Sequence, residues 1–292
     1  MSTTTPKPAP NEQNAPSTGQ NPVGRLGLIA GEGELPVYIA QNAARQGIEV
    51  VSFSIGRDNT GALKKASQGR LHRITPGLLA QNLELIRNEG IQQVVFAGKV
   101  NKWLLLKNPK LDKMAIEALK QYANNSDDAI MHWIVEALEK EGLTVLSQTR
   151  FLTDLFVPEG VLSDTRPDEM ALRDIQYGFG IAKEMGRLDV GQTIVVKNGM
   201  LLAVEAIEGT DECIRRGGKL ARKKGGVVVK VAKPKQDQRF DVPTVGLGTL
   251  KRMQRYGLNI LATEAEQTIY VDKAAMIAYA NQHKIIITSV SL

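Results

Sequence analysis

Hydrophobic and polar positions follow a repeating order in the first half of the chain. Short apolar runs typical of buried strands alternate with helical segments, and the segments Leu35–Gln46, 78–89 and 128–141 each end at a glycine. The apolar runs are LGLIAG (26–31), IEVVSFSI (48–55), QQVVFAG (92–98) and LTVLSQ (143–148). Helix, glycine and strand in this order predict a parallel sheet covered by helices. We therefore expect a Rossmann-like α/β domain over residues 25–152.

The second half of the chain has a different pattern, starting near Ser163. Asn198-Gly199 lies between two apolar runs and predicts a hairpin. Asp272 is a suitable cap for the helix that follows it. The other expected elements are helices 168–185, 211–223, 247–256 and 273–283 and strands 227–231, 259–264, 267–271 and 285–290. This pattern predicts a second α/β domain, with a mixed sheet, over residues 163–292.

Composition narrows the class of protein. The chain has 292 residues, 42% of them hydrophobic, which is enough for two cores. Its one cysteine, Cys213, excludes an intramolecular disulfide and suits a reducing compartment. Residues 1–24 are rich in Pro, Thr, Asn and Gln and predict a disordered tail. With no apolar stretch near the ~18–20 residues of a membrane span, we expect a soluble, cytoplasmic protein.

The charge balance favours anionic partners. The formal net charge is +6, and basic residues gather in 215–224 and 99–113. Aromatic residues make up only 5%, and no zinc-ligand spacing is present, so we do not expect nucleic-acid binding. The segment KWLLLKNPKLDKM (102–114) has the composition of a surface that contacts acyl chains or an anionic bilayer. A buried helix with lysines at its ends is the alternative.

The segment KPKQDQRFDVPTVG (233–246) places Asp237, Arg239 and Asp241 on alternate positions. In an extended chain the three side chains would share a face, with the two aspartates about 13 Å apart. That is too far for one metal ion unless the loop curls. Either the arginine braces two carboxylates, or the segment binds a phosphorylated ligand and its metal.

A second acidic loop, AIEGTDE (206–212), is expected to meet this segment. A strand–helix–strand crossover makes strands 200–206 and 227–231 parallel, so both loops leave the same edge of the sheet, where ligands bind. Asp211, with Asp237 or Asp241, would supply oxygen ligands for magnesium. Arg239 would hold a phosphate through two hydrogen bonds. The alternative for Thr210-Asp211 is an ordinary helix cap.

Two glycine turns in the first domain add candidates. GLIAGEGELP (27–36) lacks the third glycine of G-x-G-x-x-G, so it predicts a turn closely approached by a ligand more than a NAD site. A tight strand–helix turn is the alternative. In AGKVN (97–101), Lys99 would contact a phosphate or uracil carbonyl, unless it is simply a solvated lysine.

Seven segments together resemble the LpxI family from about Leu26 to the C-terminus. They are LGLIAGEGELP, FAGKV, NSDDAIM, LDVGQTIVVKNG, AVEAIEGTDE, GGVVVKVAKPKQDQRFDVPTVG and NILATEAEQTIYVD. The resemblance implies a magnesium-dependent hydrolase of lipid A biosynthesis, which cleaves UDP-2,3-diacylglucosamine to UMP and 2,3-diacylglucosamine 1-phosphate (lipid X). It also implies two domains with the substrate between them. The catalytic aspartate falls on QDQRFD, with Asp241 preferred and Asp237 left open, and Gln192 either contacts the nucleotide or braces its loop.

These inferences define the expected site residues and two alternative functions. The catalytic set is Asp241, Asp237, Arg239 and Asp211, the metal ligands for Mg²⁺ are Asp211, Asp237 and Asp241, and the substrate-binding set is Gly31, Gly33, Glu34, Gly98, Lys99, Gln192, Glu208, Thr210 and Lys230. We expect peripheral recruitment to the anionic inner face of the inner membrane, and a homodimer stays open. The alternatives are a non-catalytic nucleotide-sugar-binding sensor and, on the incomplete glycine pattern, an NAD-dependent oxidoreductase.

Overall fold

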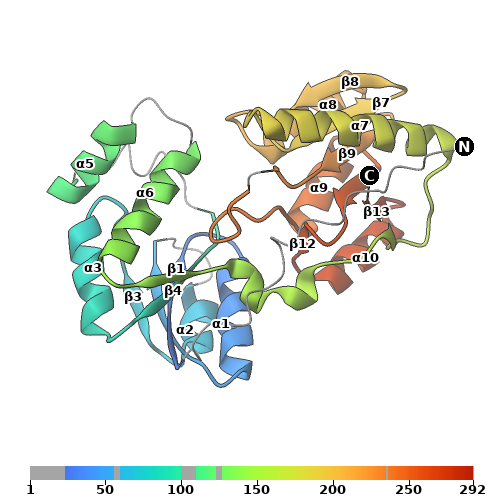
Figure 1. Cartoon of the computed structure of the whole chain (residues 1–292). Coiled ribbons are helices and arrows are strands. Elements are labelled where there is room, and N and C mark those ends of the chain that lie inside the picture. The colour runs from blue at the N-terminus through green and yellow to red at the C-terminus, as the bar shows by residue number, and fades with distance from the viewer. Residues whose placement is uncertain (1–23, 56–59, 100–109, 123–126, 235, 292) are drawn as a thin grey trace, which may run out of the picture.

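The computed structural model describes residues 24–55, 60–99, 110–122, 127–234 and 236–291. These residues form two α/β units, each built on its own sheet (Figure 1). The first unit contains β1 (Arg25–Ala30), α1 (Leu35–Arg45), β2 (Glu49–Ser54), α2 (Thr60–Ala66), β3 (Leu71–Arg73), α3 (Leu79–Asn88), β4 (Gln93–Ala97), α5 (Lys113–Tyr122), α6 (Asp127–Lys140) and β5 (Thr144–Leu146). The expected tail and most of the segment 102–114 lie outside the described residues.

The second unit follows two short 3-10 helices. These are η2 (Gln148–Phe151) and η3 (Thr153–Leu155). The unit itself contains β6 (Gly160–Val161), α7 (Glu169–Arg187), β7 (Thr193–Lys197), β8 (Met200–Val204), α8 (Thr210–Leu220), β9 (Val227–Lys230), β10 (Thr244–Val245), α9 (Leu247–Arg255), β11 (Ile260–Glu264), β12 (Ile269–Tyr270), α10 (Lys273–Gln282) and β13 (Ile286–Val290).

The N-terminal sheet is parallel throughout, with strand order β3-β2-β1-β4-β5 in the described residues. From β1 the chain builds outward in one direction through β2 and β3, and then in the other through β4 and β5. The switch point therefore lies between β1 and β4, where open α/β sheets bind their ligands. The expected Rossmann-like architecture is confirmed.

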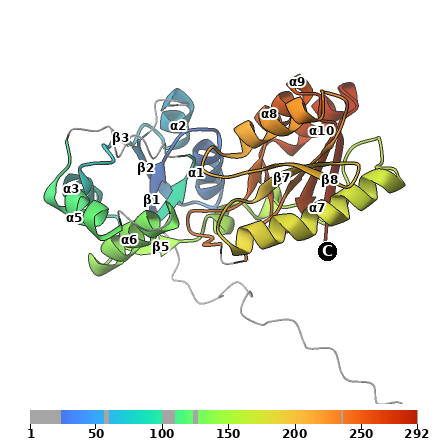
Figure 2. The same ribbon diagram turned by 90° about the horizontal axis from the view of Figure 1, so that it is seen from above.

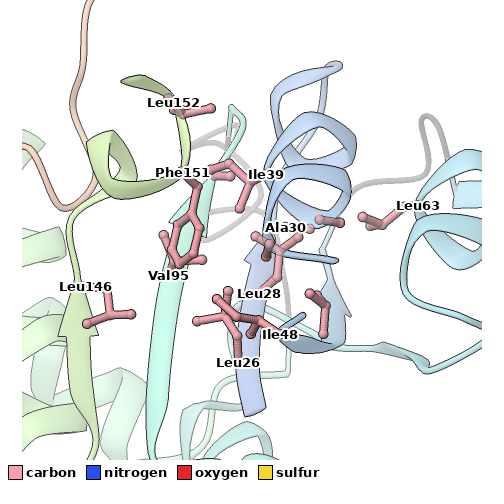
Figure 3. Close-up of a cluster of buried hydrophobic side chains, with 14 of the residues drawn as sticks. Leu26, Leu28, Ala30, Ile39, Ile48, Leu63, Val95, Leu146, Phe151 and Leu152 are labelled. Atoms are coloured by element: carbon pink, nitrogen blue, oxygen red, sulfur yellow. The ribbon is translucent and has the colours of Figure 1, made fainter. Parts of the chain in front are cut away.

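Strand residues of this sheet alternate between two cores. Leu26 and Leu28 of β1 pack with α1 and the 3-10 helix η2, as Figure 3 shows with Ile39 and Phe151 beside them. Ile29, the residue after Leu28, points to the opposite face and packs with α3 and α6. The period of two in the apolar run thus places helices on both faces of the sheet.

The C-terminal sheet is mixed, with order β6-β13-β11-β9-β7-β8. β9, β11 and β13 are parallel, whereas β7 is antiparallel to both β8 and β9. Helix α7 covers one face, and α8, α9 and α10 cover the other, as Figure 2 shows from above. The expected hairpin is confirmed, since Asn198 and Gly199 have φ of 51° and 71° between β7 and β8.

The two units share a core through β12. Ile269 and Val271 are buried in the same cluster as Phe151 and Leu155 and the α1 face of the first sheet. Asp272 directly follows and accepts a hydrogen bond from the Ala275 backbone N–H, which confirms the expected cap of α10. The connecting residues Phe151 and Leu155 are therefore buried in the apolar contact between the two units.

Several short elements did not emerge from the sequence pattern. Helix α2 buries one residue, Leu63, and β3 spans three residues with no fully buried side chain. The two-residue strands β6 and β10 pair with segments far away in the chain. Elements this short carry too few apolar positions to establish a period.

Candidate active site

The loops that follow β8 and β9 lie at one edge of the C-terminal sheet. β7 separates the two strands and is antiparallel to both, so β8 and β9 run in the same direction. At that edge the Lys230 Nζ donates to the Thr210 Oγ1 at 3.2 Å. The structure thus confirms that the carboxyl ends of the two strands meet, as the crossover rule predicted.

A hydrogen-bonded group is built around Thr210. Its hydroxyl donates to Glu205 Oε1 at 2.9 Å and accepts from Lys230. Thr193, fully buried on β7, places its Oγ1 3.3 Å from Thr210 Oγ1. Thr193 is the donor of this hydrogen bond, because the Thr210 proton is already donated to Glu205. One donation and two acceptances fill the capacity of a hydroxyl. Thr210 therefore connects protein groups, and its hydroxyl is fully used without a substrate.

Several charged groups at this edge act on the ammonium of Lys230. Its side chain is buried, and burial lowers the pKa of its ammonium. The negative charge of Glu205 counteracts this pKa shift, Lys99 adds to it, and Asp241 and Asp211 counteract it. Lys99 follows β4 of the first unit, so charged groups of both units act on one ammonium.

The segment after β9 curls instead of running extended. The Asp241 backbone N–H donates to the Asp237 carbonyl at 2.9 Å, and Phe240 N–H to the same carbonyl at 3.2 Å. The Asp237 side chain also accepts from the Arg239 backbone N–H at 2.9 Å. The shared face worked out for an extended chain does not apply, because the loop curls and the turn removes the period of two.

Arg239 braces the curled segment against the first unit. Its guanidinium contacts Asp237, with Nη2 to Oδ2 at 2.7 Å, and Glu139 of α6, with Nη1 to Oε1 at 3.2 Å. His132 Nδ1, also on α6, lies 3.6 Å from Asp237 Oδ2. Burial raises the pKa of Asp237, but the hydrogen bonds and charge of Arg239 outweigh it, so the net pKa is lowered. In this structure Arg239 takes the bracing role between carboxylates.

Asp241 lies beside a lysine at the end of the same turn. The distance from Lys233 Nζ to Asp241 Oδ2 is 3.8 Å, and the same ammonium lies 2.8 Å from Asp189 Oδ1. The Asp241 side chain keeps 29% of its surface exposed, against 15% for Asp237. Asp241 is therefore the more accessible of the two carboxylates and the one whose charge acts on Lys230.

The start of α8 differs from the expected cap. Gly209, with φ of 82°, occupies the cap position, and no side chain there bonds to the helix backbone. Asp211 instead pairs with Arg252 of α9 at 3.0 Å, and Glu208 pairs with Arg216. Thr210 is therefore not the cap, because it already belongs to the helix and bonds to Glu205, whereas Asp211 does lie in the first turn, as the alternative to a ligand site expected.

The glycine turns of the first unit meet each other at its switch point. Glu32 N–H donates to Lys99 O at 2.7 Å, and Lys99 N–H returns to Glu32 O at 2.9 Å. A Cβ on Gly31 would lie 2.4 Å from Lys99 O, and one on Gly98 would lie 2.6 Å from Glu32 O. The chain's own backbone makes the close approach that these glycines permit. This contact fixes the position of the Lys99 backbone.

Glu34 lies in a different place from the Lys230 group. It lines a cavity of about 560 Å³ between α1 and the start of α10, together with Tyr38, Asp154 and Lys273. Gly33, with φ of 95°, forms the turn that precedes it. The lining of this cavity does not include Lys230, Asp237 or Asp241, so the expected substrate-binding residues fall into two areas.

Gln192 spans two loops at the C-terminal edge. Its backbone carbonyl accepts from Val231 N–H at 3.0 Å, and its side-chain oxygen accepts from Gln236 Nε2 at 3.3 Å. The amide thus braces the chain that leaves β9, which was one of the two expected roles.

The carboxylates suit a magnesium ion that retains other ligands. Within the described residues, no three His, Cys, Asp or Glu side chains form a group that could hold a metal. Asp237 is engaged by Arg239 and Asp211 by Arg252, so the three expected aspartates do not form an all-protein cage. Magnesium commonly takes only one or two carboxylates beside waters and substrate phosphates. Asp241 and Asp211 are the two whose charges act on Lys230, although Asp211 also pairs with Arg252.

The sequence patterns did not single out Glu205, Thr193, His132 or Glu139. Glu205 closes the apolar run of β8, and its side chain is 9% exposed, with Oε2 buried and lacking a partner among the described residues. A carboxylate directly after the apolar run of β8 is a signal that the sequence does carry. His132 and Glu139 share a face of α6, but only the fold brings that face to the segment 237–239.

Comparison with known proteins agrees along the length of the chain. Residues 25–155 match the family model described as the LpxI N-terminal domain, and residues 158–288 match the LpxI C-terminal domain. A relative from Caulobacter vibrioides, named UDP-2,3-diacylglucosamine pyrophosphatase LpxI, is 33% identical over 266 residues, or 88% of this chain and 94% of that protein. With both domains matched in order on the fold described above, this chain belongs to the LpxI family.

Proposed function

We propose that the chain hydrolyses the diphosphate bond of UDP-2,3-diacylglucosamine to UMP and 2,3-diacylglucosamine 1-phosphate, a step of lipid A biosynthesis. The observation that carries the proposal is the match of both domains to the family, with a relative of that named activity aligned over 94% of its length. The grouping of Lys230, Lys99, Asp241 and Asp211 supports it, because cations and carboxylates together suit a diphosphate and its metal.

In this proposal the lysine ammonium groups bind the substrate phosphates, and a carboxylate activates the attacking water. The ammonium groups of Lys230 and Lys99 bind phosphate oxygens and offset the charge that develops during P–O cleavage. Asp241, the more exposed aspartate, orients the attacking water and accepts its proton. Arg239 and Asp237 hold the turn on which Asp241 lies.

Magnesium dependence is part of the same proposal. Asp241 and Asp211 would hold the ion together with substrate phosphate oxygens, and a bound Mg²⁺ supplies charge neutralisation at the diphosphate. The start of α8, beside Asp211, adds backbone N–H groups that favour an anion.

The direct test uses the purified protein with UDP-2,3-diacylglucosamine and Mg²⁺. Release of UMP and the acylated sugar phosphate in equal amounts supports the proposal. Tight binding of UDP or the substrate, with no UMP released at any magnesium concentration, would instead favour a sensor that binds nucleotide sugars.

Peripheral membrane association belongs to the proposal as well, since a diacylated substrate resides in a bilayer. None of the helices in the described residues has both the length and the apolar character needed to cross a bilayer. The net charge of +6 favours an anionic inner leaflet of the cytoplasmic membrane. Co-sedimentation with anionic vesicles that is lost in high salt supports this, and equal binding to neutral vesicles contradicts it. Trp103 and Leu105, expected to contact lipid, lie outside the described residues.

A further inference from the structure

The buried carboxylate of Glu205 is not explained by the roles given so far. Its side chain is 9% exposed, and one oxygen, Oε2, has no hydrogen-bond partner within the described residues. Its other oxygen, Oε1, accepts from Thr210 at 2.9 Å. A buried charge with one unsatisfied oxygen is costly, so it is retained where a neighbouring positive charge needs it.

That positive charge is the ammonium of Lys230. In the part of the chain that the structure describes, Lys230 Nζ makes one hydrogen bond, to Thr210 Oγ1 at 3.2 Å. An ammonium has three donors, so two remain available for an anionic ligand. The Thr210 hydroxyl bridges the two charged side chains. It accepts a hydrogen bond from Lys230 and donates its proton to Glu205.

We propose that Glu205 is a positioning residue, which acts through Thr210 to orient the Lys230 ammonium and keep it charged for a substrate phosphate. The proposal rests on the proposed function, because it assigns the phosphate of that substrate to Lys230. Glu205 itself does not touch substrate. It sets the charge state and direction of the group that does.

The charges around Lys230 make the consequence specific. Burial and Lys99 lower the pKa of Lys230, while Glu205, Asp241 and Asp211 raise it, and Glu205 is the largest of the raising charges. Glu205→Gln removes the charge but keeps an oxygen that accepts from Thr210. The pKa of Lys230 then falls, and the protonated form is lost at a lower pH.

The first experiment measures Lys230 without turnover. The ¹³Cε signal of Lys230, assigned by its loss in Lys230→Arg, is titrated in the wild type, in Glu205→Gln and in the control Glu212→Gln. Glu212 lies on α8, pairs with Arg215 and is not among the main charges that act on Lys230, so Glu212→Gln removes the same charge from a neighbouring element. We expect a lower pKa in Glu205→Gln only, and coinciding titrations of all three proteins overturn the proposal.

The second experiment follows UMP release against pH. We expect the alkaline limb of the kcat/KM profile of Glu205→Gln to move to lower pH, with the rate at low pH kept near that of the wild type. If the pKa of Lys230 falls by about one unit, kcat/KM at pH values above the wild-type pKa falls about tenfold. A uniform loss at every pH would instead mean a purely structural role and overturn the proposal.

The bridge through Thr210 provides a second pair of variants, should Glu205→Gln fold poorly. Thr210→Ser keeps the hydroxyl and is expected to retain the wild-type titration of Lys230, whereas Thr210→Ala is expected to lower its pKa. Equal titrations of these two variants overturn the proposal. If the wild type releases no UMP, the proposed function fails, while the NMR titrations still decide the role of Glu205.

Discussion

Arg239 holds Asp237 as a two-pronged ion pair, with Nη2 to Oδ2 at 2.7 Å and Nε to Oδ1 at 3.0 Å. The same guanidinium reaches Glu139 of α6 at 3.2 Å. The carboxylate that it holds is therefore committed to the shape of the turn, and the charge of Asp241, four residues later, acts on Lys230. This division between the two aspartates leads to separate predictions for each.

Asp241→Asn is expected to lower the kcat for UMP release by about 100-fold or more, because it removes the proposed base. The melting temperature should change little, since the side chain is partly exposed. Asp189→Asn is the matched control, because Asp189 pairs with the same Lys233 and has a φ of 56° that asparagine tolerates. A wild-type rate in Asp241→Asn would rule out Asp241 as the base.

Asp237→Asn is expected to destabilise the fold by about 1.5–3 kcal/mol at pH 7, since it breaks a charged hydrogen-bonded pair. The effect should depend on pH in a defined direction. The pKa of Asp237 is lowered on folding, so its stabilisation is fully present above the unfolded pKa, near pH 4, and is lost as pH falls through the folded pKa.

Urea unfolding of the wild type and Asp237→Asn at pH 7, 5, 4 and 3 measures this. The difference in unfolding free energy should stay constant between pH 7 and 5 and shrink below about pH 4. A difference that stays the same down to pH 3 would show that the ion pair does not stabilise the turn.

Gly31→Ala is expected to destabilise the first unit by about 1–3 kcal/mol, because the new Cβ would lie 2.4 Å from Lys99 O and the backbone must shift. The displaced Lys99 should also weaken UMP binding. Gly61→Ala on α2 is the control, since no heavy atom of the described residues lies within 4 Å of its Cβ and alanine favours the helix. Thermal melts and calorimetry with UMP compare them, and a Gly31→Ala protein as stable as the control contradicts the prediction.

Removal of divalent metal with EDTA is expected to abolish UMP release without unfolding the protein. The described residues form no group of three metal-binding side chains, so a magnesium ion contributes little to the fold. Activity should return on adding Mg²⁺, and the melting temperature should move by no more than about 2 °C, roughly the effect of 0.5 kcal/mol. Full activity in EDTA would remove the metal from the proposal.

Much of the architecture could be predicted because it depends on local pattern. A continuous apolar run gave β1 two packed faces, with Leu28 and Ile29 on opposite sides, because side chains alternate along a strand. Asn198-Gly199 specified the hairpin because both residues accept positive φ. The shared edge of β8 and β9 followed from the strand–helix–strand connection, which makes the two strands parallel whatever their side chains.

The candidate site could be predicted only in outline. The two loops that meet were identified, but neither the curl at Asp237 nor the pairing of Arg239 with Glu139, 100 residues away, was identified. Asp211 was expected beside the other aspartates, yet Arg252 of α9 holds it. Pairing partners of this kind come from distant parts of the chain, and the sequence order carries no record of them.

The sequence by itself determined two sheets, their covering helices and the loops that carry the acids and the guanidinium, since these depend on hydrophobic period and chain direction. Only the tertiary structure decided which charges act on one another. It buried Lys230 beside Glu205, brought Lys99 of the first unit to the same ammonium, and committed Asp237 to the turn. The physical reason is that burial and distance set the strength of a charge interaction, and both are properties of packing between segments far apart in the chain.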